Sequence, residues 1–305
     1  MTNILITGGT GLIGSELCKL LIKKSYNVAV LSRSKDIEGI KSFYWDYTKG
    51  ILDEEAIEFA DIIVHLAGEN ISNKRWNNSQ KQKIFDSRIK TTDLLFAKTE
   101  KAKKKPHSII STSAIAYYGT ETTDKIFKEN DGPGKGFLPE TVVAWEKSVD
   151  KFSKLGIRSL KLRTGVVLSN EGGALKKMSV PVKFGLGAAL GNGKQYIPWI
   201  EISDLAEMFL FAIENKNLKG VFNAVAPEYI NNFEFMKTLA SSLNKAFFMP
   251  SIPAFIIKLL YGEMSVILLE GSRISSEKIQ SAGFDFKFKN VENVINYPEA
   301  EPSRY

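Results

Sequence analysis

An apolar strand pattern near the start of the chain runs directly into a glycine-rich turn. Residues 4–7 read ILIT, and glycines follow at positions 8, 11 and 14, where a segment with helical spacing begins. In such a turn Gly8 permits the tight bend, Gly11 lets the backbone approach a diphosphate, and Gly14 lets helix and strand pack closely. The free N–H groups of the helix would face the same anion. The motif favours a dinucleotide site over an ordinary glycine-rich turn, with cofactor contacts from Gly8, Thr10, Gly11, Leu12, Ile13 and Gly14.

Apolar runs and helical segments alternate through most of the first 215 residues, which is typical of strand–helix–strand units around a parallel sheet. The predicted strands cover residues 4–7, 28–32, 43–46, 62–68, 108–114 and 158–168. The predicted helices cover residues 12–24, 79–99 and 139–154. We therefore expect an α/β fold with a Rossmann-like, doubly wound parallel sheet, whose strand ends converge on one crevice.

The amino-acid composition of the chain changes after Leu168. Six glycines crowd into residues 172–193, and an apolar segment that includes Trp199 follows. Such stretches carry substrate loops, and we expect the glycines of residues 185–193 to form a lid, with Trp199 as its packing anchor or as a core residue. Asp204 is expected to cap the next helix. We assign residues 1–168 to the nucleotide-binding domain, with 199–226 returning to it, and residues 169–198 and 227–305 to a smaller substrate or cap domain.

The end of the second predicted strand bears on the choice between NAD and NADP. An NAD site usually carries an acid about 20 residues beyond the glycines, where it binds the ribose hydroxyls. Here that place reads LSRSK, in which Arg33 and Lys35 offer positive charge and Ser32 offers a hydroxyl. A 2′-phosphate suits these side chains better, so NADP(H) is the predicted cofactor. Asp36 and Glu38 keep NAD as the alternative, because a shift of the loop would bring an acid to the ribose.

Composition narrows the classes of function. Lys and Arg number 41 against 34 Asp and Glu, a net charge of +7, but the basic residues are scattered, so no nucleic-acid partner is expected. No signal-peptide pattern and no uninterrupted apolar run of spanning length is found, so we expect a cytoplasmic protein without a membrane partner. The single cysteine, Cys18, is expected in the core. His65 and His107 lack neighbouring ligands at metal-binding spacing, so no metal site is predicted.

Five motifs follow one another along the chain: TGGTGLIG from residue 7, VHLAGENI from 64, STSAIAYYG from 111, RTGVVLS from 163 and PWIEISDLA from 198. Their order resembles the extended short-chain dehydrogenase/reductases of the NAD-dependent epimerase/dehydratase superfamily. The terminal PAFIIKLLYGEM resembles a subfamily, called epimerase family proteins, that has its own C-terminal domain. The resemblance implies that Asp46 binds the adenine amino group and that Ala67 and Gly68 pass close to the cofactor. Homodimers are common in the superfamily, so a homodimer stands beside a monomer as an expectation.

The catalytic pattern of the superfamily is missing. Its members use a Tyr and, four residues later, a Lys on one helical face, which together move a proton while a hydride moves. Here the two registers read Val142 with Glu146, or Val143 with Lys147. Glu146 could act as a base, but an ion pair with Arg163 is the interpretation we favour.

Polar residues at the ends of two predicted strands are the candidates to replace the missing Tyr-Lys pair. Ser113 matches the superfamily's substrate-binding hydroxyl, and Tyr117 or Tyr118 could donate a proton if a nearby cation stabilised the phenolate. Glu69 and Asn70 follow the Ala-Gly pair, where a solvated acid and a turn cap are the alternatives.

The sequence leaves two functions open. One is an NADP(H)-dependent oxidoreductase or nucleotide-sugar-type epimerase that acts on a small carbonyl or sugar-like substrate without the Tyr-Lys pair. The other is a non-catalytic NADP(H)-binding protein that regulates or senses redox state through a partner.

Overall fold

A central sheet of eight strands organises the protein, and the computed structural model describes residues 1–33 and 39–297. The strand order is β11-β8-β6-β5-β1-β2-β3-β4. The bounds are β1 Asn3–Thr7, β2 Asn27–Ser32, β3 Lys41–Asp46, β4 Ile51–Leu52, β5 Ile62–His65, β6 Ser108–Ala114, β8 Arg158–Thr164 and β11 Gly220–Ala224. Strands β1, β2, β3, β5 and β6 pair in parallel, and β4 is antiparallel to β3. The sheet confirms the expected α/β, Rossmann-like class.

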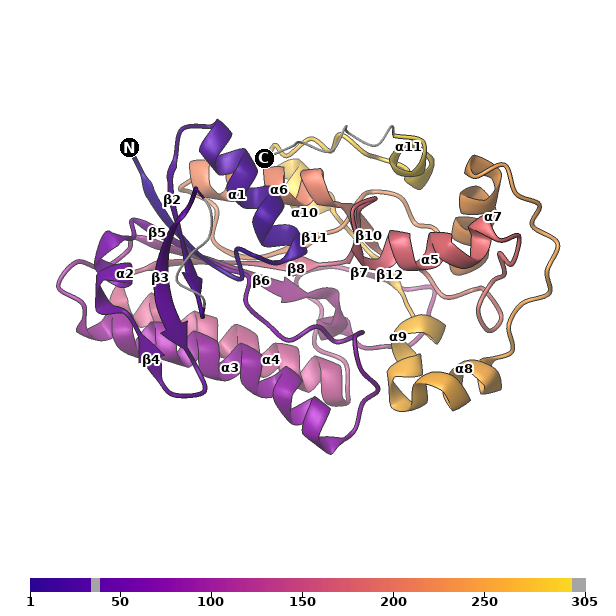
Figure 1. The fold of residues 1–305 in the computed structure, drawn as a ribbon, viewed down its shortest axis with the longest axis horizontal. Helices are drawn as coiled ribbons and strands as arrows, with labels where there is room; N and C mark the ends of the chain where they lie inside the picture. Colours follow the sequence, from indigo (N-terminus) through magenta and orange to yellow (C-terminus); the bar gives the residue numbers. More distant parts are fainter. Residues whose placement is uncertain (34–38, 298–305) are drawn as a thin grey trace. The chain divides into compact units, whose positions relative to one another are not determined.

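Helices cover both faces of this sheet. They are α1 Leu12–Lys23, α2 Glu54–Phe59, α3 Asn78–Lys101, α4 Phe137–Asp150 and α6 Ile202–Glu214, with 3₁₀ turns η1 Ile115–Tyr118 and η2 Lys151–Leu155. Helices α3 and α4 run side by side along one face, and α1 lies on the other (Figure 1). Because side chains alternate along a strand, Leu5, Ile63 and Ile109 share the face toward α4, where they pack with Trp145 and Phe152.

The chain reverses its direction of growth across the sheet at β1. It builds β2 and β3 on one side of β1, and then places β5 and β6 on the other side. In open α/β sheets, ligands bind outside the carboxyl ends of the two strands that flank such a switch point. The fold therefore directs attention to the turns after Thr7 and His65.

The described chain divides into two compact units. The first comprises Met1–Gly119, Gly132–Arg163 and Leu205–Phe222, and it contains the glycine-rich turn and most of the sheet. The second comprises Thr120–Asp131, Thr164–Asp204 and the chain from Asn223.

Short elements make up the second unit. They are β7 Ile126–Phe127, β9 Val166–Leu168, α5 Gly173–Lys183, β10 Trp199–Glu201, α7 Asn232–Ser242, α8 Ala254–Tyr261, η3 Gly262–Ser265, α9 Val266–Leu269, β12 Arg273–Ile274, α10 Glu277–Ser281 and α11 Val291–Ile295. Trp199 is fully buried among Leu168, Phe235 and Leu239, so it is a core residue of this unit. None of the described helices is long and apolar enough to cross a membrane.

Two local expectations are wrong. The strand expected over 158–168 ends at Thr164, and β9 pairs instead with β10 in a separate two-stranded sheet. Within the glycine-rich stretch, α5 buries Leu175 and Val182 on one face, and the lid expected over residues 185–193 stays a prediction. Asp204 is not a helix cap, since it lies inside α6.

Glu201 does the capping in place of Asp204. Its Oε2 accepts hydrogen bonds from the backbone N–H groups of Ser203 and Asp204, at 2.6 and 3.2 Å. The carboxylate of Asp204 instead accepts from the backbone N–H groups of Lys287 and Phe288, both at 2.9 Å. The sequence could not show this bond because its partners are more than 80 residues apart.

Candidate nucleotide and active site

The glycine-rich turn has the geometry of a phosphate-binding loop. Gly8 has a φ of +70°, a conformation that side chains disfavour. A Cβ on Gly14 would lie 2.2 Å from the carbonyl oxygen of Gly8, so only glycine fits where α1 meets the turn. Helix α1 starts at Leu12 without a side-chain cap and without an acid in its first turn. Its first N–H groups are therefore set to bind an anion.

A buried hydrogen-bond chain joins this turn to the one after β5. Thr7 Oγ1 accepts from the backbone N–H groups of Leu66 and Ala67, at 3.1 and 3.0 Å, and lies 2.7 Å from His65 Nδ1. Burial lowers the pKa of His65 to about 3, helped by the charge of Arg88, so the ring is neutral. With both acceptor sites of its hydroxyl filled, Thr7 donates its proton to Nδ1.

The proton of the neutral His65 ring is then on Nε2, 3.0 Å from Thr92 Oγ1. That hydroxyl donates in turn to the backbone oxygen of Arg88, at 2.6 Å. Every link has one donor and one acceptor, so the chain fixes the His65 tautomer and locks both turns to α3. In the described ranges, no group of His, Cys, Asp and Glu side chains is placed to hold a metal ion.

The residues predicted to select NADP lie at the ends of β2 and β3. Ser32 ends β2 and is half-buried, and Arg33 follows it with an exposed side chain. Lys35 lies outside the described residues. Asp46 ends β3, and its Oδ1 accepts from the Thr48 hydroxyl and backbone N–H, at 2.6 and 3.0 Å. These bonds, the hydroxyl first, lower the pKa of Asp46 and keep it an acceptor, as an adenine amino group requires.

Ser113, Glu146 and Arg163 form the charged centre of the first unit. Ser113 Oγ donates to Glu146 Oε1 at 2.6 Å. Arg163 binds the same carboxylate with two nitrogens, Nε to Oε1 at 2.8 Å and Nη2 to Oε2 at 2.9 Å. All three side chains are buried, at 4, 7 and 3% exposure. The expected pairing of Glu146 with Arg163 is confirmed.

Both phenols of η1 contact the same guanidinium. Arg163 Nη1 donates to Tyr118 Oη at 3.0 Å, and Arg163 Cζ lies 3.3 Å from the centre of the Tyr117 ring. A cation that donates to a phenol oxygen stabilises the phenolate. Its contacts with Glu146 and Tyr118 raise the pKa of Arg163 against the opposing effect of burial, so the guanidinium stays charged. Tyr118 thus has the cation that the sequence analysis required for a proton donor.

The structure decides the register of α4. Val142, Trp145 and Glu146 are buried and Lys147 is exposed. Val142 and Glu146 therefore lie on the buried face of α4, and Glu146 rather than Lys147 is the charged residue of that face.

Glu69 and Asn70 form a polar turn after Gly68. Asn70 Oδ1 accepts from the Ser72 backbone N–H at 2.8 Å, as a turn cap does, and its side chain is exposed. The Glu69 backbone N–H donates to Ser87 Oγ at 2.8 Å, and its carboxylate accepts from Gln80 at 3.3 Å. None of these bonds brings either side chain to the Ser113 cluster.

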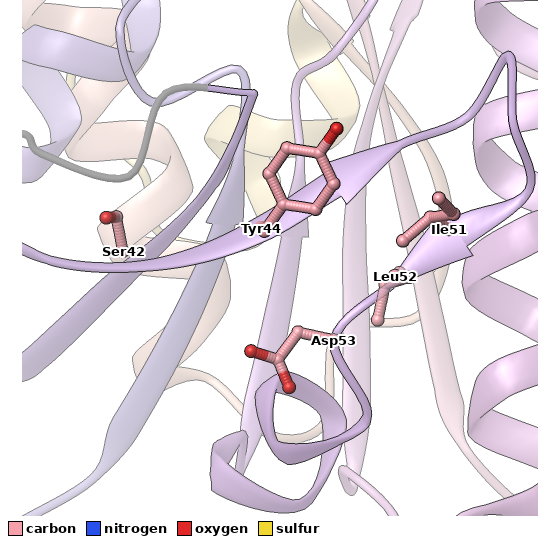
Figure 2. Close-up of a pocket in the computed structure, with 5 residues that line it drawn as sticks. All are labelled: Ser42, Tyr44, Ile51, Leu52 and Asp53. Carbon is pink, nitrogen blue, oxygen red and sulfur yellow. The ribbon is translucent and has the colours of Figure 1, made fainter.

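A hollow of about 440 Å³ lies at the far edge of the same sheet. Figure 2 shows its lining residues on β3, β4 and the start of α2: Ser42, Tyr44, Ile51, Leu52 and Asp53. Asp53 Oδ1 accepts from the backbone N–H of Glu55 at 3.1 Å, so its carboxylate serves as the cap of α2. None of the predicted site residues lines this hollow.

The sequence analysis missed Thr7, His65 and Arg88 as partners in one network. Arg88 had a usable signal, because positions 84, 88 and 92 fall one turn apart on the buried stripe of the helix.

Comparisons with known proteins bear on the whole chain. A sequence model described as the NAD dependent epimerase/dehydratase family matches residues 4–224, and a domain of unknown function, DUF1731, matches residues 252–296. An epimerase family protein of Staphylococcus aureus is 33% identical over 296 residues, which are 97% of this chain and 98% of the relative. The epimerase family protein YfhF of Bacillus subtilis is 34% identical over 297 residues, or 96% of this chain and 97% of that one.

Solved structures agree with these sequence matches. The human epimerase family protein SDR39U1, solved with NADPH, has a TM-score of 0.86 and 31% identity, and the match covers 97% of this chain and 98% of that one. A nucleoside-diphosphate sugar epimerase from Corynebacterium glutamicum has a TM-score of 0.79 and 28% identity, over 96% of this chain and 57% of that one.

Proposed function

Because the chain belongs to the NAD-dependent epimerase/dehydratase family, we propose that it is an NADP(H)-dependent oxidoreductase or epimerase of a small sugar-like alcohol or ketone. The observation that carries the proposal is the 2.6 Å hydrogen bond from Ser113 Oγ to Glu146 Oε1. It gives the chain a proton pathway in place of the missing Tyr-Lys pair.

The residues at the carboxyl ends of β1, β2 and β3 fit a dinucleotide. The compressed turn at Gly8 and Gly14 leaves the start of α1 open to a diphosphate, and Asp46 offers an acceptor to adenine. The positively charged Arg33 suits a 2′-phosphate, and the human relative was solved with NADPH. When bound, the nicotinamide would accept a hydride from the substrate carbon or return it.

The proton would move through Ser113. Its hydroxyl donates its one proton to Glu146, so the Oγ lone pairs remain to accept the proton of a substrate alcohol. As that proton reaches Oγ, the original one passes to Glu146 Oε1, and the same steps run backward for a ketone. Arg163 holds the carboxylate in place with two bonds and so keeps Oε1 beside the Ser113 hydroxyl.

Tyr118 offers a second path for the proton. The Arg163 guanidinium that binds its oxygen would stabilise a phenolate, as a lysine does in the superfamily pattern. Tyr118→Phe removes that path and keeps the ring, so it separates the two assignments. The Ser113 route predicts a modest effect of Tyr118→Phe and a large effect of Ser113→Ala.

The first test is a fluorescence titration of cofactor-free protein with NADPH and, in parallel, with NADH. We expect NADPH to bind more tightly than NADH. A screen that follows NADPH absorbance should then include nucleotide sugars first, because a relative 28% identical is named a nucleoside-diphosphate sugar epimerase. Binding of neither dinucleotide would contradict the proposal at its first step.

The decisive variant is Ser113→Ala. Loss of a positioned proton-transfer group lowers kcat about 10²- to 10⁴-fold, while the dissociation constant of NADPH should change less than about twofold. Ser111→Ala is the matched control, because Ser111 lies on the same strand but donates to the backbone oxygen of Thr112. Equal turnover in both variants would remove Ser113 from the mechanism.

One observation favours the non-catalytic alternative. Glu146, at the position of the superfamily lysine, is already engaged by both arms of Arg163, as a purely structural ion pair would be. If NADPH binds tightly and no alcohol or carbonyl class is turned over, the protein is an NADP(H)-binding regulator, and its partner binding should depend on whether the cofactor is oxidised or reduced.

A further inference from the structure

Arg88 is a half-buried cation with unused hydrogen-bond donors. It lies on α3, and its Nη1 donates to the backbone oxygens of Glu69 and Ile84, at 3.1 and 3.0 Å. A guanidinium carries five N–H donors, and Nη1 accounts for two of them. Within residues 1–33 and 39–297, Nε and Nη2 of Arg88 have no hydrogen-bond partner and no carboxylate forms an ion pair with it.

The guanidinium is held in an unfavourable environment. Burial lowers the pKa of Arg88 to about 10, and the charge of Glu69 opposes this effect only in part. Its Cζ stands 5.3 Å from the centre of the Trp145 ring. Such a cation–π contact recovers a fraction of the lost hydration of an arginine.

The position of Arg88 relates it to the predicted nucleotide site. Its Cζ would lie 3.4 Å from a Cβ built on Gly68, so the guanidinium rests against this exposed glycine. On the other side of the same turn, a Cβ on Gly8 would lie 3.1 Å from the backbone nitrogen of Ala67. Arg88 and the glycine-rich turn therefore contact consecutive residues of one segment, at the carboxyl ends of the adjacent strands β1 and β5.

We propose that Arg88 binds the diphosphate of the dinucleotide cofactor, opposite the start of helix α1. Nε and Nη2 form the planar fork that grips two oxygens of a phosphoryl group. The diphosphate carries the charge that the protein leaves uncompensated at this site. This inference rests on the cofactor assignment of the proposed function, and it gives diphosphate binding a cation that the glycine motif alone does not contain.

The proposal separates two arginines by the part of the cofactor that each one binds. NADH and NADPH share the diphosphate, whereas only NADPH has the 2′-phosphate that Arg33 would read. Arg88→Met should weaken the binding of both dinucleotides, by roughly 10- to 100-fold, since bonds to charged groups are among the stronger ones. Arg33→Gln should weaken NADPH alone. Arg75→Gln, at an exposed site outside the network, should change neither.

The same variants are tested for stability without ligand. Arg88→Met keeps the length of the side chain and removes a poorly compensated charge, so its Tm without ligand should equal or exceed that of the wild type. The rise in Tm on adding NADPH should shrink. Arg88→Lys keeps the charge but not the fork, and it should fall between wild type and Arg88→Met in affinity for both dinucleotides.

Two results would overturn the inference. If the wild type binds NADPH and Arg88→Met and Arg88→Lys bind both dinucleotides as tightly, Arg88 does not hold the diphosphate, and the proposed function stands. The same conclusion follows if Arg88→Met lowers the ligand-free Tm while Arg88→Lys leaves both affinities unchanged. If the wild type binds neither dinucleotide, the cofactor assignment falls and the inference falls with it.

Discussion

At the scale of single residues, the carboxylate of Glu146 decides which groups can bond to one another at the site. A lysine there would leave Arg163 facing a like charge, whereas the carboxylate takes two bonds from Arg163 and one from Ser113. With glutamate at position 146, the site is therefore built on an ion pair, where a lysine would supply a single ammonium group. Ser113 gains a proton acceptor, and Tyr118 gains a cation from Arg163.

The Glu146–Arg163 pair makes a prediction about stability. Glu146→Gln leaves a buried guanidinium without its counter-ion and should lower the free energy of unfolding by about 3–5 kcal/mol. The double variant Glu146→Gln with Arg163→Met removes the orphaned charge as well, so it should be more stable than Glu146→Gln alone. Urea unfolding of the four proteins in this cycle measures the coupling, and additive losses would show that the two side chains do not depend on each other.

At the scale of elements, the sequence predicted what depends on local periodicity. The alternation of apolar runs and helices gave the sheet, and glycine spacing placed the turn between β1 and α1. The sequence did not decide whether Val142 with Glu146 or Val143 with Lys147 forms the inner face of α4. Both pairs have apolar neighbours in the sequence, so the apolar pattern does not distinguish them. The split after Thr164 could not be predicted, because the partner of β9 is β10, more than 30 residues away.

The hydrogen-bond chain through His65 links β1, β5 and α3, and it predicts a pH dependence. The pKa of His65 is about 3 in the folded protein and 6.5 in the unfolded chain, so the unfolded chain takes up the proton first as the pH falls. This residue's stabilisation is complete above about pH 6.5 and is lost toward pH 3, by about 1.4 kcal/mol per pH unit.

The measurement is the free energy of urea unfolding from pH 7 to pH 4.5, compared between wild type and His65→Gln. The variant should be less stable at pH 7 and should show a shallower loss on acidification. His107→Gln is the control, because His107 is exposed and burial lowers its pKa to a lesser degree. Parallel pH profiles for wild type and His65→Gln would mean that folding does not change the pKa of His65.

At the scale of the whole molecule, distant parts of the sequence are joined by a few buried carboxylates. Asp204 accepts from two backbone N–H groups in the segment before α11, and burial raises the pKa of Asp204 against these bonds. Phe288, whose N–H is one of the donors, is 3% exposed. Both bonds lie within the second unit.

Asp204→Ala should therefore loosen the C-terminal part of the second unit. The buried Phe288 N–H loses its acceptor, which costs about 1–3 kcal/mol, and the partly exposed Lys287 N–H loses its own at a smaller cost. Hydrogen exchange at the Lys287 and Phe288 amides should speed up strongly, while amides of β1 and β5 stay protected. Asp285→Ala is the control, because the Asp285 side chain is exposed and pairs with Lys289 on the surface. Unchanged exchange at residues 287 and 288 would contradict this role of Asp204.

The interleaving of the two units has a consequence for synthesis on the ribosome. The chain leaves the first unit after Gly119 and again after Arg163, and it returns for the last time between Leu205 and Phe222 to supply β11. A nascent chain of 200 residues therefore carries β8 as an unpaired edge. The sheet is complete only after more than two thirds of the protein has been made, so we expect the edge of β8 to stay open to strand pairing until then.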